Sequence, residues 1–171
     1  MSDISITDDL PGALDNPVRQ RSGTVDIAAP PEAVWELVTS LDRYGEWSNE
    51  NTGGYWRKGE DGEPGTGQVG DMFVGVNKLD GEEWKAPVEI VQRVENRDFG
   101  FVTGGLDYNI VLWRYQLEPS EGGTRLTESW TLRQLSPRMI ENGDSELEYR
   151  TGNAEKGIES TLAALKAALE S

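Results

Sequence analysis

The sequence contains no cysteine and no histidine. Without cysteine it can form no disulfide, no thiolate nucleophile and no sulfur-ligated metal site. Without histidine it lacks the commonest general base, the serine–histidine and cysteine–histidine pairs, and the usual zinc and iron ligands. Any catalysis must come from carboxylates, tyrosine, lysine, arginine or bound water. No EF-hand-like spacing of carboxylates occurs, so we expect neither a metal nor another cofactor.

Basic residues are also scarce, because 16 Lys and Arg stand against 31 Asp and Glu, for a formal net charge of −15. Such a surface repels phosphate backbones and anionic head groups, so we expect no nucleic-acid partner. No run approaches the roughly 18 apolar residues of a membrane span, and the first ten residues lack the pattern of a signal peptide. We predict a cytoplasmic protein, with monomer and homodimer both open.

The length of 171 residues fits one domain that buries roughly two-thirds of its unfolded surface. Residues 1–20 are polar, acidic and without periodicity, which predicts a flexible N-terminal arm, with packing on the outside of the sheet as the alternative. Residues 21–171 are expected to form the single folded domain.

The domain opens with a predicted strand at residues 22–28, in which Val25 and Ile27 share one face. The pair Pro30-Pro31 indicates a helix start, and a second helical turn is expected at residues 42–48. The following region alternates in hydrophobicity between short turns, and Asp80-Gly81 is a hairpin signal. Pro87 suggests an edge position or a bulge, and residues 104–107 a loop. The strands expected here are 55–58, 68–79, 83–94, 99–103, 109–118 and 124–134.

A long helix is predicted from residue 144 to about residue 170. Ser145 and Glu148 have the spacing of a capping box. The apolar stripe that identifies the helix consists of Ile158, Leu162, Leu165 and Leu169.

This order of elements predicts an α+β fold of the helix-grip type. A seven-stranded curved antiparallel sheet would wrap around the long C-terminal helix, with two short helices after the first strand. Because one helix cannot fill the concave side of such a sheet, we expect an internal cavity that holds a small apolar molecule.

Three segments carry a resemblance to a known family: VDIAAPPEAVWELVTSLDRYGEW (25–47), GDMFVGVNKLDGEEW (70–84) and WRYQLEPSEGGTRLTESW (113–130). Over residues 22–170 the chain resembles the START/Bet v 1-like (SRPBCC) superfamily, in particular its polyketide cyclase/dehydrase-like bacterial branch. The resemblance implies the same fold. The superfamily contains lipid and sterol carriers, hormone receptors, aromatase/cyclases and chaperone activators, so the resemblance does not by itself determine a function.

Alternation along the last predicted hairpin indicates which side chains face inward. Leu126, Glu128 and Trp130 share one side of the last strand, and Trp113 and Tyr115 share one side of the preceding strand. Glu128 is thus an acid on an apolar face, where desolvation raises a carboxyl pKa. It either pairs with an arginine or tyrosine or lies at a wet strand end, or else it is the polar anchor, or the general acid or base, of the cavity. Tyr115 is its nearest cross-strand candidate partner.

The sequence does not decide which of two alternating sets of side chains in residues 70–78 faces the cavity. Either Met72, Val74 and Val76 face inward, or Phe73, Gly75 and Asn77 do, and the glycine slightly favours the second. Of the six tryptophans, Trp35 is expected in the core, and Trp47 and Trp56 near the cavity mouth. The predicted ligand-binding residues are Phe73, Asn77, Trp84, Trp113, Tyr115, Glu128 and Trp130, with Glu128 as the candidate catalytic residue.

Three functions remain open from these observations. The leading hypothesis is a binding module for a small hydrophobic molecule such as a lipid, a polyketide-like aromatic or an isoprenoid. The second is a cofactor-independent polyketide cyclase or dehydratase that uses Glu128, with Tyr115 and Asn77 as orienting groups. The third is a protein-interaction module with a collapsed cavity.

Overall fold

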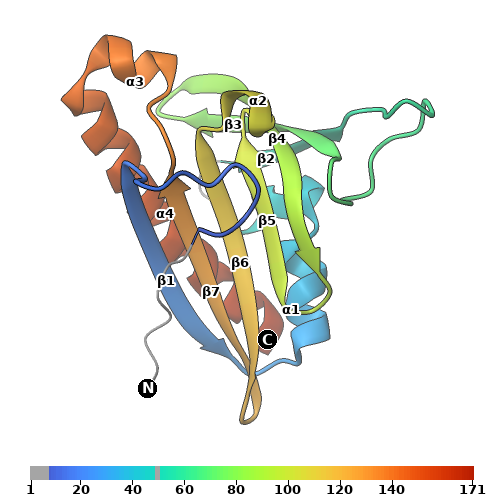
Figure 1. Cartoon of the computed structure of the whole chain (residues 1–171). Helices are drawn as coiled ribbons and strands as arrows, with labels where there is room; N and C mark the ends of the chain where they lie inside the picture. The colour runs from blue at the N-terminus through green and yellow to red at the C-terminus, as the bar shows by residue number, and fades with distance from the viewer. Residues whose placement is uncertain (1–7, 49–50) are drawn as a thin grey trace.

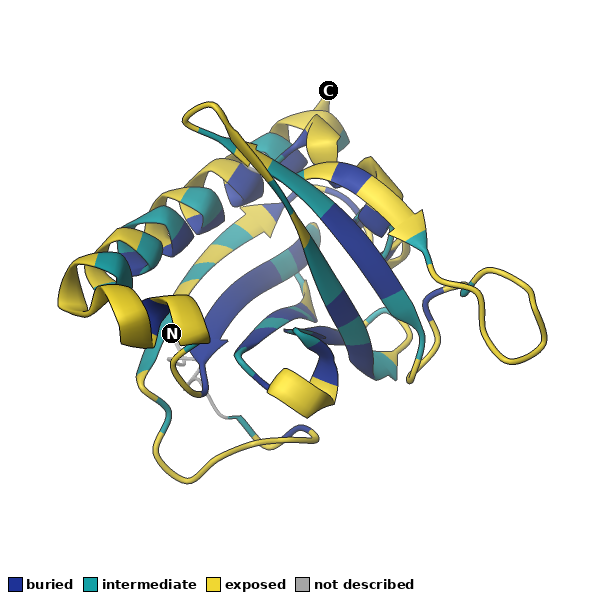
Figure 2. Cartoon of the chain, turned by 90° about the horizontal axis from the view of Figure 1, so that it is seen from above, coloured by how far each residue is buried: buried dark blue, intermediate teal, exposed yellow. Residues whose placement is uncertain are grey.

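The computed structural model describes residues 8–48 and 51–171. Seven antiparallel strands form one sheet in the order β1-β7-β6-β5-β4-β3-β2. This sheet curves around the long helix α4 (Figures 1 and 2), which confirms the predicted helix-grip fold. The strands are β1 (Arg19–Ile27), β2 (Asn51–Trp56), β3 (Met72–Leu79), β4 (Glu82–Val94), β5 (Asp98–Thr103), β6 (Val111–Ser120) and β7 (Gly123–Leu132).

The helices lie at the ends and on the concave side of the sheet (Figure 1). The two predicted short helices after β1 are present, the second as a 3-10 helix, η1, and two further short helices flank the last hairpin. The helical elements are α1 (Pro31–Val38), η1 (Leu41–Glu46), α2 (Gly105–Tyr108), α3 (Pro137–Asn142) and α4 (Asp144–Glu170).

Helix α4 packs on the sheet through one stripe of residues. Its buried residues are spaced three or four apart, which places them on one face of the helix. Ile158 and Leu162 reach the β1 backbone so closely that a Cβ at Gly23 would lie 2.8 Å from Ile158 Cγ2. Glycine at this position therefore lets the helix approach β1. The buried residues of α4 are Thr151, Ala154, Ile158, Thr161, Leu162 and Leu165.

The predicted capping box of α4 is wrong. The helix begins at Asp144 after Gly143, whose φ is 74°, and no side chain caps it. Because α3 runs directly into this glycine, the backbone amides of Glu146 and Leu147 bond to the Gly143 carbonyl, and Ser145 already lies inside the first turn. The side-chain cap belongs to α3 instead, where Ser136 accepts a hydrogen bond from the Met139 amide.

Pro87 was expected at an edge or a bulge, and the structure contradicts both. Strand β4 lies between β3 and β5, and its register shift falls between Ile90 and Gln92. The proline is tolerated because β5 ends beside it: the Pro87 carbonyl accepts a bond from Gly104, just past the last residue of β5. Proline has no backbone N–H to donate to the neighbouring strand, but on this side β5 has already ended, so no hydrogen bond of the sheet is lost.

Two segments between strands differ from their predicted form. The predicted loop at residues 104–107 forms α2, which ends at Asn109 in the left-handed conformation. The strand expected from residue 68 begins only at Met72, because the Asp71 carboxylate accepts bonds from the amides of residues 66, 67 and 68 and closes a turn there. The Asp80-Gly81 hairpin is confirmed, with both residues at positive φ.

Residues 8–18 lie across the outer, convex face of the sheet (Figure 1). Leu10 packs with Val91, Val102 and Leu112 in a second small core. Beside it, Arg133 Nε and Nη2 each donate a hydrogen bond of 2.8 Å to the Asp8 carboxylate. These two side chains are 0% and 4% exposed, so an ion pair is buried under the segment.

Breaking this buried ion pair is expected to destabilise the protein. Asp8→Asn leaves the Arg133 charge buried without its counter-ion, which costs about 3–5 kcal/mol of unfolding free energy. Asp9→Asn is the matched control, because Asp9 is 66% exposed and its partner Arg114 keeps Asp98 at 2.6 Å. We expect the control to lose less than about 1 kcal/mol. Urea unfolding of both variants measures the difference, and equal losses would contradict a special role for Asp8.

Candidate functional site

A cavity of about 550 Å³ lies between the concave face of the sheet, η1 and α4. This volume is within the range of about 300–1,000 Å³ typical of small-molecule sites. Its lining runs from the buried middle of β7 to the end of the molecule at which α2 and α3 lie. There Tyr108 of α2 is 65% exposed and Arg138 of α3 is exposed, so the cavity reaches the surface at this end, here called the mouth.

Every side chain predicted to bind a ligand lines this cavity. The open parity of residues 70–78 is also resolved, because Phe73, Gly75 and Asn77 line the cavity whereas Met72, Val74 and Val76 do not. Contact of these side chains with a ligand stays a prediction. The set brought together is Phe73, Asn77, Trp84, Trp113, Tyr115, Glu128 and Trp130.

The three remaining tryptophans occupy different places. Trp35 packs edge-on against Phe99, with ring centroids 6.0 Å apart, as a core residue. Trp47 lines the cavity and is buried. Trp56 is not part of the lining, and it packs behind Phe73 at 5.0 Å, where it supports the cavity wall.

Glu128 lies at the buried end of the cavity, in the middle of β7, and is 4% exposed. It is directly opposite Tyr115 in the β6–β7 register, and the Tyr115 hydroxyl donates to Glu128 Oε2 at 2.9 Å. The predicted cross-strand partner is therefore present. No described residue bonds to Glu128 Oε1, although this atom is buried.

Burial determines the electrostatics at this end of the cavity. Desolvation raises the pKa of Glu128 to about 8, and the hydrogen bond from Tyr115 opposes this only in part. Burial also raises the pKa of Tyr115 and of Tyr44 well above the usual value, and the nearby Glu128 carboxylate adds to both shifts. At pH 7 the carboxyl group is therefore mostly protonated and neutral.

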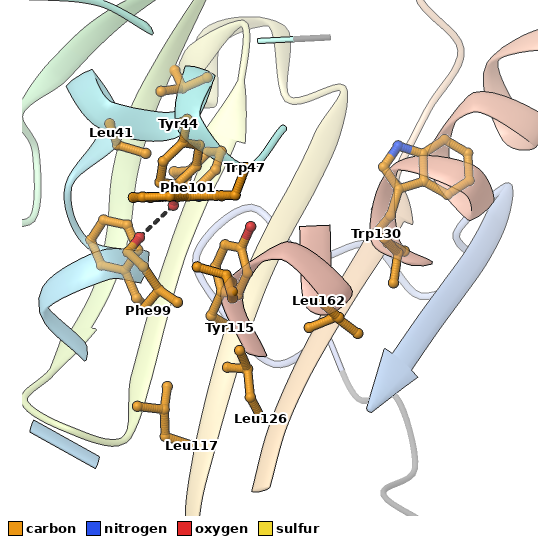
Figure 3. Close-up of a cluster of buried hydrophobic side chains, with 14 of the residues drawn as sticks. Leu41, Tyr44, Trp47, Phe99, Phe101, Tyr115, Leu117, Leu126, Trp130 and Leu162 are labelled. Carbon is orange, nitrogen blue, oxygen red and sulfur yellow. Dashed lines mark hydrogen bonds between the residues drawn. The ribbon is translucent and has the colours of Figure 1, made fainter. Parts of the chain in front are cut away.

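Tyr44 of η1 and Trp47, the residue that follows this helix, lie beside Phe101 and Tyr115 in the cavity wall (Figure 3). The Tyr44 ring lies 6.3 Å from those of Phe101 and Tyr115, and its hydroxyl donates to the Val38 carbonyl. Tyr44 was not among the predicted site residues. The only sequence signal for it was its place, three residues before Trp47, in a short helical turn.

The mouth carries charged residues that sequence reasoning also missed. Glu146 of α4 lies between Arg138 Nε at 3.4 Å and Arg150 Nε at 3.1 Å. The Arg150 guanidinium also lies over the Trp84 ring, 5.2 Å from its centroid, and so connects α4 to β4. For the two residues of α4, Glu146 and Arg150, the sequence signal was helical spacing. It puts residues 146, 150, 153 and 157 on one face of the helix, and all four line the cavity.

Residues 8–48 and 51–171 hold no group of three or more histidine, cysteine, aspartate or glutamate side chains placed to bind a metal ion. None of their helices is long and apolar enough to cross a membrane.

The sequence matches a family model described as polyketide cyclase / dehydrase and lipid transport, over residues 20–170. The Polyketide_cyc-like protein Cgl2372 from Corynebacterium glutamicum is 30% identical, with a TM-score of 0.64 over 92% of this chain and 94% of that one. No curated protein sequence matches the chain.

Two more distant solved structures share the fold. The di-domain ARO/CYC BexL, from the BE-7585A biosynthetic pathway, is 18% identical, with a TM-score of 0.68. The alignment covers 90% of this chain and 50% of BexL. The Aha1 dimer from Colwellia psychrerythraea is 17% identical, with a TM-score of 0.60 over 90% of this chain and 97% of that one.

The raised pKa of Glu128 predicts a specific pH dependence of stability. In the unfolded chain the carboxyl titrates near 4.5, whereas in the folded protein its pKa is about 8. Between these values the folded state keeps a proton that the unfolded state has lost, so the contribution of Glu128 to stability is fully present below pH 4.5 and is lost as pH rises to about 8. Glu128→Gln removes this effect. Relative to the variant, the wild type should lose about 1.4 kcal/mol per pH unit in this window.

Urea unfolding of both proteins between pH 4.5 and 8.5 measures the difference in unfolding free energy. Glu121→Gln, in the exposed turn of the same hairpin, is the control and should follow the wild type. Parallel curves for wild type and Glu128→Gln would contradict a buried, neutral carboxyl group.

Proposed function

Because the chain belongs to the polyketide cyclase/dehydrase and lipid transport family, we propose that it binds one small hydrophobic molecule, of lipid, polyketide-like or isoprenoid type, in its internal cavity. The observation that carries this proposal is the cavity itself, about 550 Å³ of space that no side chain fills. The third hypothesis, a protein-interaction module, assumed a collapsed cavity, and an open cavity of this size does not support it.

The lining supports an apolar, partly flat guest. Aromatic rings form opposite walls, with Phe73 and Trp84 on the β3–β4 side and Trp113 and Trp130 on the β6–β7 side. Burial of an apolar ligand against these walls contributes about 25 cal/mol to binding for each Å² of its surface removed from water. The neutral carboxyl group of Glu128 can orient the ligand through a hydrogen bond, and because it is uncharged its desolvation costs little.

A second candidate function, catalysis of a cyclisation or dehydration, is favoured by one observation. Glu128 has a pKa of about 8, and its Oε1 has no hydrogen-bond partner among the described residues. A general acid works best when its pKa is close to the working pH. The neutral carboxyl would donate its proton to a leaving hydroxyl, and the carboxylate so formed would accept a proton from the adjacent carbon.

Binding is tested with the uncharged fluorescent probe N-phenylnaphthylamine. We expect saturable binding at one probe per chain, because the cavity of about 550 Å³ has room for one molecule of this size and is lined largely by apolar side chains. Ala154→Phe fills the cavity from α4 and should weaken binding at least about tenfold, if the ring occupies the space that the probe needs. Ala163→Phe is the matched control, because it adds the same ring to the exposed side of the same helix.

The melting temperatures of both variants separate blocked binding from unfolding. Unchanged affinity in a folded Ala154→Phe protein would contradict binding in the cavity. Saturation at several probes per chain would indicate surface adsorption instead.

Catalysis is tested with the hydroxyketone precursor of benzylideneacetone, whose dehydration forms a strongly absorbing enone. If Glu128 is the acid, the wild type should speed this reaction and Glu128→Gln should lower kcat about 10²-fold or more. The variant should still bind the product enone. Equal rates in both proteins, or no rate above that of buffer, would remove the catalytic candidate and leave the binding proposal standing.

A further inference from the structure

Three buried side-chain nitrogen or oxygen atoms have no hydrogen-bond partner within residues 8–48 and 51–171. They are Trp47 Nε1, Glu128 Oε1 and Asn153 Nδ2. All three residues line the cavity, from three different elements: the end of η1, β7 and α4. Buried polar groups in native proteins are nearly always satisfied, so these three atoms call for partners beyond the described residues, such as water or a ligand.

All three atoms act as hydrogen-bond donors. The indole nitrogen of tryptophan and the side-chain nitrogen of asparagine donate hydrogen bonds and cannot accept them. With the Tyr115 hydroxyl donating to Glu128 Oε2 at 2.9 Å, the proton of a neutral carboxyl group is assigned to Oε1, which has no partner among the described residues. Each of the three therefore presents a free donor to the cavity.

Among residues 8–48 and 51–171, no cationic side chain contributes to the electrostatics of Glu128 in a way that would favour its charged form. The titratable groups beside it are Tyr115 of β6 and Tyr44 of η1, and its raised pKa comes from burial, opposed by the Tyr115 bond. Its β1 neighbour is Gly23, over which the apolar Ile158 and Leu162 of α4 lie. The other charged residues that line the cavity are Lys85, Arg138, Glu146 and Arg150.

We propose that the cavity selects an uncharged ligand whose buried part carries hydrogen-bond acceptors and no donors, of ketone, quinone or ester chemistry, through Trp47 Nε1, Glu128 Oε1 and Asn153 Nδ2. This inference rests on the proposed function and narrows its ligand class. In the free protein, water supplies the acceptors. A carbonyl oxygen that displaces such a water keeps the hydrogen bonds, a hydrocarbon loses them, and an N–H group opposes donor to donor.

Three tricyclic probes of nearly equal shape separate these cases: fluorene has no polar group, fluorenone has only an acceptor, and carbazole has only a donor. Titration calorimetry at pH 7 should show fluorenone binding about 5- to 30-fold tighter than fluorene, from one or two net hydrogen bonds. Carbazole should bind no tighter than fluorene. Equal affinities, or a preference for carbazole, would overturn the inference.

Two variants assign the preference to residues. Trp47→Phe keeps an aromatic ring but removes the donor, and should reduce the preference for fluorenone over fluorene about 3- to 10-fold. Glu128→Gln keeps an N–H donor that cannot ionise. Between pH 7 and 9.5, the wild type should therefore lose affinity for fluorenone, while the Glu128→Gln protein should not.

The outcomes distinguish this inference from the function on which it rests. If none of the three probes binds, the proposal of an apolar ligand in the cavity fails, and the inference fails with it. If all three bind equally well and Ala154→Phe blocks them all, the cavity is a binding site but its donors do not select the ligand. If the preference for fluorenone persists unchanged in Trp47→Phe, the assignment to Trp47 is wrong. If the wild type and Glu128→Gln respond to pH in the same way, the assignment to Glu128 is wrong.

Discussion

The contact between α4 and β1 at Gly23 is the constraint on which the rest of the structure depends. Ile158 and Leu162 lie so close to this glycine that the helix is held over the β1–β7 side of the sheet. Because the sheet curves and the helix is a single rod, α4 cannot also pack against β3 and β4. Long side chains bridge that distance instead: Arg150 lies over Trp84, and the Tyr149 hydroxyl donates to Asp80 at 2.8 Å. The cavity is the space that this one-sided packing leaves.

The same packing sets the chemistry at the buried end of the cavity. Glu128 faces Tyr115, a glycine and apolar groups, and burial raises its pKa to about 8 because no cation in the described part of the chain stabilises its charge. Binding and protonation are consequently linked. A ligand that accepts a hydrogen bond from the neutral carboxyl stabilises the protonated form, and so raises the Glu128 pKa further. A protein with a net charge of −15 thus keeps its most buried acid uncharged.

Sequence reasoning reached the fold and the sheet residues of the site because both depend on period-two alternation. A strand has only two faces, and Leu126, Trp130 and the paired Trp113 identify the inner one, which places Glu128 and Tyr115 in the cavity. The missed residues depend on contacts with no such pattern. Asn153 and Arg150 lie on a polar flank of α4 that resembles any solvated helix face, and Asp8 finds Arg133 across 125 positions of chain. The capping box failed for a local reason, since the N-cap is Gly143, two residues before Ser145, and Ser145 lies inside the first turn.

Carrier and catalyst use the same carboxyl group, and the difference between them is one of position. A carrier needs only that an acceptor on the ligand meets Glu128 Oε1. A dehydratase needs, in addition, a leaving hydroxyl and an adjacent C–H within hydrogen-bond reach of that one carboxyl, because the other two buried atoms without a described partner, Trp47 Nε1 and Asn153 Nδ2, donate and cannot act as a base. Tyr44 and Tyr115 do not change this, since both hydroxyls already donate and burial keeps both protonated. Catalysis therefore requires a ligand shaped to present both groups to Glu128, whereas binding requires only that acceptors on the ligand meet the donors of the cavity.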